Sequence, residues 1–241
     1  MKLTYIFHSC FAVESDAFSI LIDYYQDAWE GEAAGYVRRH ILTRPGPLYV
    51  LSSHSHADHF NPEVLQWRQE KSDIRYILSR DILTTGKAKA GDGVVFLDKR
   101  ESYQDAHLRV EAFGSTDIGI SFLIETEGKK IFHAGDLNNW HWKDESTPEE
   151  SQAYERQFLK ELDELSRSAP ELDLAMFPID PRLGSDYMRG AQQLVDTIHV
   201  GLFVPMHFIK SYAKANAFKK YANSRGTRFL EIARQGESAS F

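Results

Sequence analysis

Three histidines and one aspartate stand within six residues of this chain, in the segment 53–60 (SHSHADHF). The segment directly follows the run Leu48–Ser52, which is typical of a buried strand. Alternate side chains of an extended segment point the same way, so His54 and His56 can share one face. A turn into a helix near Asp58 would bring that carboxylate and His59 toward the same centre. Imidazole nitrogens and carboxylate oxygens suit zinc, and also iron or manganese, so the segment predicts a metal site.

The elements that must position this segment change along the chain from mostly β to alternating β and α. Residues 147–168 form the clearest helix, because Thr147 can cap it and Pro148 suits its first position. The turn pair at 127–128 predicts a hairpin between two strands. We expect strands at 3–9, 10–15, 19–24, 48–52, 75–79, 94–98, 108–113, 119–126, 129–133, 172–178, 202–206 and 227–233, and further helices at 187–199 and 213–223.

The residues from His54 to His59 match the His-x-His-x-Asp-His motif, and the chain resembles the metallo-β-lactamase superfamily along nearly its whole length. The resemblance implies an α/β fold, a four-layer αββα sandwich, as a single domain over 1–241. Segment 131–136 (IFHAGD) resembles the element whose aspartate, here Asp136, bridges two metals. Segment 205–208 (PMHF) resembles the one that carries the C-terminal histidine, here His207.

By this resemblance, the first metal uses His54, His56 and a third histidine, and the second uses Asp58, His59 and His207, with Asp136 shared. The third histidine is missing, because the segment where it should fall, 110–119, contains none. Three outcomes stay open. The first site is weak, or another residue replaces the histidine, or a water held by Thr116 completes the site. The replacement candidates are His133, His141 and Asp117.

A narrower resemblance, to the UlaG-like branch of the superfamily, rests on segments 7–11 (FHSCF) and 21–23 (LID). It implies that His8 and Asp23 orient metal ligands through hydrogen bonds. Segment 177–182 (FPIDPR) resembles the loop of that branch before the penultimate helix. There Arg182 could hold an anionic group or form a surface salt bridge, and Asp180 could be catalytic or structural.

These ligands predict a metal-dependent hydrolase, because a divalent metal lowers the pKa of bound water from near 16 to about 7. We expect one or two ions per chain, with Asp58 as proton acceptor and a small, anionic ester, lactone or phosphodiester as substrate. The alternative is a metal-binding sensor or regulatory module with little activity, since a histidine is replaced near Thr116. Redox chemistry at an iron pair is a third option, but no flavin domain fits in the chain.

Composition limits the partners. The net charge is −7 and the basic residues are scattered, which argues against nucleic acid. No apolar run is long enough to span a membrane, no signal peptide is recognisable, and the single Cys10 fits a reducing compartment, so we expect a cytoplasmic protein. Segment 25–47 is a candidate insertion or lid. Its aromatic residues would suit either a lid or a contact in a homo-oligomer.

Overall fold

Two sheets of seven strands form the centre of the molecule in the computed structural model, which describes residues 1–91 and 93–241. The first sheet has the order β14-β1-β2-β3-β4-β5-β6 and the second the order β13-β12-β11-β10-β9-β8-β7. The strands of the first sheet are β1 (Lys2–Phe7), β2 (Cys10–Glu14), β3 (Ser19–Ile22), β4 (Leu48–Ser52), β5 (Ile74–Ser79), β6 (Val94–Leu97) and β14 (Ser238–Ser240). Those of the second are β7 (Ser102–Gln104), β8 (Arg109–Phe113), β9 (Ser121–Thr126), β10 (Lys129–His133), β11 (Glu171–Pro178), β12 (His199–Met206) and β13 (Arg228–Phe229).

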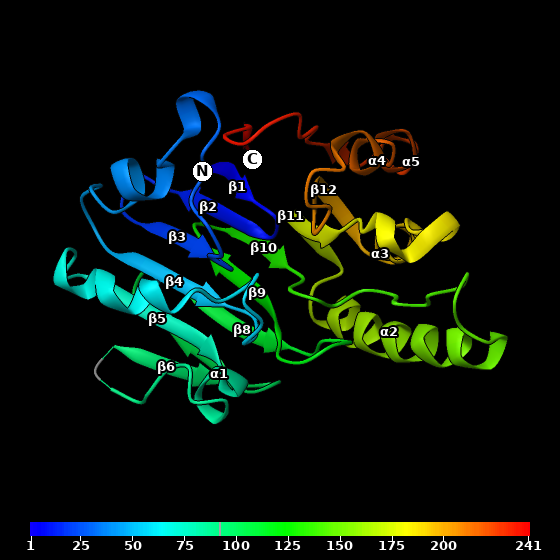
Figure 1. Cartoon of the computed structure of the whole chain (residues 1–241), viewed down its shortest axis with the longest axis horizontal. Helices are drawn as coiled ribbons and strands as arrows, with labels where there is room; N and C mark the ends of the chain where they lie inside the picture. Colours follow the sequence, from blue (N-terminus) through cyan, green and yellow to red (C-terminus); the bar gives the residue numbers. More distant parts are fainter. Residues whose placement is uncertain (92) are drawn as a thin grey trace.

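Helices cover the outer face of each sheet, which completes the expected four layers (Figure 1). The second sheet carries α2 (Pro148–Ser168), α3 (Arg189–Thr197), α4 (Tyr212–Asn216) and α5 (Lys219–Ser224). The first sheet carries the π-helix η2 (Val37–Ile41) and the 3₁₀ helix η3 (Pro62–Gln69). Three further short helices are η1 (Gly31–Ala33), α1 (Arg80–Thr84) and η4 (Pro181–Asp186). The fold class predicted from the sequence is therefore confirmed.

The two halves repeat one pattern of strand directions. In each sheet three strands with antiparallel pairing lead into a parallel run, β3 to β6 in the first sheet and β10 to β13 in the second. The predicted hairpin joins β9 to β10, and both turn residues have positive φ, 48° at Glu127 and 74° at Gly128. Thr147 caps α2 as expected, and the structure shows that it forms a capping box with Glu150. Among the described residues, no helix is both long and apolar enough to cross a bilayer.

Two elements near the C-terminus differ from the prediction. The helix expected at 213–223 is divided into α4 and α5, and the strand expected at 227–233 contains only Arg228 and Phe229. The strand is short because of a tertiary contact: the side chain of Asn216 bonds both the N–H and the carbonyl oxygen of Ile232. The main chain of Ile232 is thereby taken out of the sheet.

Segment 25–47 packs on the outer face of the first sheet. Val37, Ile41 and Leu42 are buried there against side chains of β1 to β4. The buried carboxylate of Glu14 holds the segment through His40, at 2.7 Å, and Arg44, at 3.0 Å. A role for this segment as a lid stays a prediction.

Candidate metal centre

The candidate site residues gather where strands of both sheets end. His8 follows β1, His54 follows β4, Asp136 lies just beyond β10, and His207 follows β12. In α/β proteins the carboxyl ends of parallel strands form the usual crevice for a ligand. The sheet topology thus brings together side chains that are far apart in the sequence.

One group of candidate ligands consists of His8, Asp58, His59 and His207, with one ligand atom of each within 4.8 Å of the others. The distance from Asp58 Oδ2 is 3.3 Å to His8 Nε2 and 4.0 Å to His59 Nε2. The histidines are buried, whereas the side chain of Asp58 is 46% exposed. The sequence predicts that His8 orients a metal ligand through a hydrogen bond. In the structure its Nε2 is itself one of the four candidate ligand atoms.

The second group consists of His54, His56, Asp117 and Asp136. His56 Nδ1 lies 3.1 Å from His54 Nε2 and 3.5 Å from Asp117 Oδ2. Asp117 comes from the segment after β8, where the resemblance placed the missing histidine. The carboxylate of Asp117 therefore lies where the resemblance places the third histidine of the first metal site.

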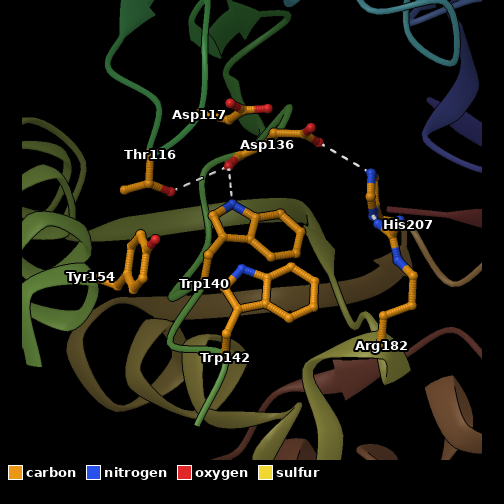
Figure 2. Close-up of a pocket in the computed structure, with 8 residues that line it drawn as sticks. All are labelled: Thr116, Asp117, Asp136, Trp140, Trp142, Tyr154, Arg182 and His207. Atoms are coloured by element: carbon orange, nitrogen blue, oxygen red, sulfur yellow. Dashed lines mark hydrogen bonds and ion pairs between the residues drawn. The ribbon is translucent and has the colours of Figure 1, made fainter. Parts of the chain in front are cut away.

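Asp136 connects the two groups through different oxygens. Its Oδ1 lies 3.2 Å from His59 Nε2 and 3.4 Å from His207 Nε2, and its Oδ2 lies 3.4 Å from His54 Nε2. The ion pair between Asp136 and His207 is drawn in Figure 2. This arrangement suits a carboxylate shared between two ions.

The donor atoms fit a bound metal, because several are buried without a hydrogen-bond partner. Within the described part of the chain, this holds for Nε2 of His8, Nε2 of His59 and Oδ1 of Asp136. A buried polar atom without a partner is costly, and such atoms in native proteins often indicate an ion or a water. Three such atoms in adjoining groups therefore point to cations.

Electrostatics agree with that fit. Burial lowers the pKa of His8 and of His54 to about 4, so both rings are neutral at pH 7, as a metal ligand must be. Burial also acts to lower the pKa of His59, but the carboxylates of Asp136 and Asp23 outweigh it and raise the pKa to about 9. The negative charge that retains a proton on His59 would equally attract a divalent cation.

Two buried carboxylates orient His59 and His207 by contacting the Nδ1 side of each ring, opposite the Nε2 atom of the candidate metal site. Asp23 Oδ2 accepts a hydrogen bond from His59 Nδ1 at 2.7 Å, and Asp180 Oδ2 lies 2.9 Å from His207 Nδ1. Asp23 also accepts bonds from the N–H and the hydroxyl of Ser53, both at 2.7 Å. Burial raises the pKa of Asp23, but His133 and His59 outweigh it and bring the value to about 2. The carboxylate is therefore ionised. Carboxylates in this position fix the tautomer and direction of a ligating ring.

Three of these residues have a backbone conformation that non-glycine residues rarely adopt. The φ angles are 58° at His8, 49° at Asp23 and 62° at His207. Each residue directly follows a strand, so the left-handed turn directs its side chain across the sheet edge. Such strain persists only where the surroundings enforce it, and it occurs most often at functional sites.

Thr116 and His133, two of the predicted candidates, make other contacts. The hydroxyl of Thr116 donates to the carbonyl oxygen of Asn138 at 2.6 Å and accepts from its N–H at 2.9 Å. His133 Nε2 lies 2.9 Å from the carbonyl oxygen of Ser9, and its Nδ1 accepts from the N–H of Gly135 at 3.1 Å. Both side chains are therefore occupied by main-chain groups, which argues against a water held by Thr116 and against His133 as the replacement ligand.

His141 and Arg182 are also engaged. His141 Nε2 lies 3.1 Å from the carbonyl oxygen of Asp186, and its Nδ1 accepts from the N–H of Lys143 at 3.0 Å. Arg182 is held by Asp180 through Nε and Nη2, whereas its Nη1 makes no hydrogen bond within residues 1–91 and 93–241. The hydrogen bonds from His207 and Arg182 outweigh burial and hold the pKa of Asp180 well below its usual range.

A cavity of about 300 Å³ adjoins Asp136 and His207 (Figure 2). Its wall includes Trp140, Trp142 and Tyr154, which the sequence did not single out as site residues. The two tryptophans follow the bridging aspartate in the run 137–142 (LNNWHW), a loop that must pass near the site. The position of the two tryptophans just after Asp136 could have identified them from the sequence. No neighbouring residue indicates that Tyr154, which belongs to α2, lines the cavity.

Gly119 lets the loop after β8 pass directly against His54. Its φ is 80°, and a Cβ there would lie 2.2 Å from the carbonyl oxygen of Ser53 and 2.4 Å from His54 Cβ. Gly119→Ala should lower the free energy of unfolding by about 3 kcal/mol or more, since the clash adds to the cost of a left-handed alanine. Thermal unfolding checks this. Gly128→Ala is the matched control, because Gly128 has φ 74° but open space, and it should lose only about 1–2 kcal/mol. An equal loss of unfolding free energy in the two variants would contradict the close contact between Gly119 and His54.

Comparison with known proteins agrees with this geometry. A family described as "Beta-lactamase superfamily domain" matches residues 2–207. A UPF0173 metal-dependent hydrolase of Symbiobacterium thermophilum is 26% identical over 253 residues, covering 99% of each chain. A UPF0173 protein of Pyrococcus furiosus is 27% identical over 233 residues, covering 93% of this chain and 92% of the relative.

Solved structures share the fold. A metallo hydrolase of Ignicoccus hospitalis matches with a TM-score of 0.68 at 20% identity, covering 100% of this chain and 97% of the other. CmlA, a diiron β-hydroxylase of Streptomyces venezuelae, matches with a TM-score of 0.66 at 13% identity, covering 100% of this chain but 53% of its own. Family match, fold and clustered ligands agree: the chain belongs to the metallo-β-lactamase superfamily of metal-dependent hydrolases.

Proposed function

We propose that this protein hydrolyses a small-molecule ester, lactone or phosphodiester with two divalent ions, of which zinc is the first candidate and manganese or iron the others. The observation that carries the proposal is the pair of ligand groups joined by Asp136, with buried donor atoms that lack partners. His54, His56 and Asp117 would hold one ion and His8, Asp58, His59 and His207 the other. A bound divalent cation supplies hydroxide at neutral pH by lowering the pKa of water to about 7.

Asp58 is the residue we propose to accept the proton from the attacking water. It is the exposed member of its group, so solvent reaches its carboxylate. The ring of His8, with Nε2 3.3 Å from Asp58 Oδ2, holds the pKa of Asp58 far below its usual range, so the carboxylate is ionised before the reaction.

The substrate we propose is small and carries an anionic group. A cavity of about 300 Å³ is at the lower end of the usual range for ligand sites. Arg182 lines it, and Asp180 occupies two of the guanidinium nitrogens, which leaves Nη1 to meet an anion. Placement in the UlaG-like branch and a cytoplasmic location remain predictions.

Asp117 favours the hydrolase over the regulatory alternative. That alternative depended on a first site lacking one ligand near Thr116. A carboxylate one residue further on lies 3.5 Å from His56, which supports a complete donor set. A carboxylate is also a harder ligand, in the acid–base sense, than an imidazole. Manganese or iron therefore competes better with zinc at the first site.

The test combines metal content with turnover. Elemental analysis of the purified protein should find two ions per chain, Asp117→Ala should lose one, and Thr116→Val should keep both because its hydroxyl bonds only main chain. Wild type should turn over a member of an ester, lactone and phosphodiester panel, and His59→Ala should not. Two ions without turnover on any of the three classes would overturn the hydrolase. Loss of an ion in Thr116→Val but not in Asp117→Ala would overturn the ligand assignment.

A further inference from the structure

The cavity beside the metal centre has a polar end and an aromatic side. Figure 2 shows Asp117 and Asp136 at the top of the view, His207 and Arg182 to the right, and Tyr154 to the left of two tryptophans. A molecule whose reacting group lies near Asp136 can therefore place its remainder along the aromatic side chains.

The two tryptophans form one stacked unit fixed by the site itself. The ring centroids of Trp140 and Trp142 are 6.1 Å apart and their planes differ by 16°. Trp140 is buried, its Nε1 donates to the carbonyl oxygen of Asp136 at 2.8 Å, and its ring meets that of His207 edge to face at 5.6 Å. The unit is thus positioned before any ligand arrives.

Trp142 is held with its ring at the cavity at an energetic cost. Its φ is 40°, which for so bulky a side chain is a true outlier. Trp142 is only half-buried, and Tyr154 is 40% exposed. A strained backbone that presents an incompletely covered aromatic side chain at a cavity suggests a binding role.

We infer that this aromatic wall, formed by Trp140, Trp142 and Tyr154, binds a flat aromatic ring, so the hydrolysed bond belongs to an aryl or arylalkyl compound. This substrate class rests on the proposed function. The volume suffices, since an apolar cavity of about 150 Å³ already holds benzene. Aromatic rings gain from stacking beyond the area they bury, which a saturated ring does not. An organic cation also suits aromatic walls, but Arg182 lines the same space, and the metal ions of the proposed function would add further positive charge beside it.

Binding of product-like carboxylates to the metal-loaded protein tests the inference. The probes are phenylacetate, cyclohexylacetate, acetate and trimethylglycine, with affinity measured by isothermal titration calorimetry. Phenylacetate should bind about two- to tenfold more tightly than cyclohexylacetate, the range that aromatic stacking supplies. No probe contains a bond to hydrolyse, so ring preference is measured independently of turnover. If ring preference appears without turnover, the proposed function fails alone. Turnover without ring preference overturns only this inference.

Two variants in different elements test whether the aromatic wall causes the preference for phenylacetate over cyclohexylacetate. Trp142→Leu should remove it, and so should Tyr154→Ala near the start of α2. Leu159→Ala is the matched control, because Leu159 is also 40% exposed on α2 but does not line the cavity. Equal binding of phenylacetate and cyclohexylacetate, or a preference unchanged in both variants, would overturn the inference. So would tighter binding of trimethylglycine, which would indicate a site for organic cations.

Discussion

Replacing Asp136 with alanine is expected to remove bound metal and to reduce kcat/KM by more than about 100-fold. Loss of groups that merely orient a ligand already costs about 10- to 100-fold in metal affinity or activity. Asp136 contacts both ligand groups directly, through Oδ1 to His59 and His207 and through Oδ2 to His54. Elemental analysis and steady-state kinetics on the most active substrate provide the measurement.

A comparison of thermal stability separates this effect from misfolding. Without metal, Oδ1 of Asp136 still lies 3.2 Å from His59 Nε2 and raises the pKa of that ring, so the metal-free protein should lose only this ion pair when Asp136 is removed. The metal-free variant should therefore remain folded and melt only slightly below metal-free wild type. Asp173→Ala is the control, since Asp173 pairs with Lys129 away from the centre. Two retained ions in Asp136→Ala would show that this carboxylate is not shared.

Replacing Asp23 with alanine should have the largest effect on stability. Asp23 is fully buried and ionised, and its removal leaves the N–H and hydroxyl of Ser53 and the ring of His59 without their acceptor. Breaking a buried charged network in this way costs about 3–5 kcal/mol. For a chain of this size that corresponds to a fall in Tm of about 6–20 °C.

Asp23→Asn distinguishes orientation of His59 from simple structural support. Asparagine can still accept from the N–H of Ser53, but its amide cannot replace the ionised oxygen that accepts from His59 Nδ1. We expect most of the stability to return, while metal affinity, measured by competition with a chelator, remains about 10- to 100-fold weaker. Wild-type metal affinity in Asp23→Asn would contradict an orienting role.

Local sequence determined a large part of this molecule. The segment His54 to His59 contains its ligand types at intervals that a strand and the following turn convert into a site, so its chemistry was readable directly. The α2 helix, with Thr147 as cap, and the hairpin at Glu127 and Gly128 were equally predictable. In each case neighbouring residues and short-range geometry decide the outcome.

Tertiary structure decided what is specific to the centre. His8 and Asp117 join the ligand groups although β2 and β3 separate β1 from β4 and β8 belongs to the other sheet, so their meeting depends on the order and packing of the two sheets. Thr116 and Asp117 are neighbours in the chain, yet one bonds the main chain of Asn138 and the other reaches His56. Tyr154 faces the tryptophans because α2 packs on the second sheet beside their loop. These contacts join residues distant in sequence, so spacing carries no information about them, and only the packing of the sheets and helices positions the side chains.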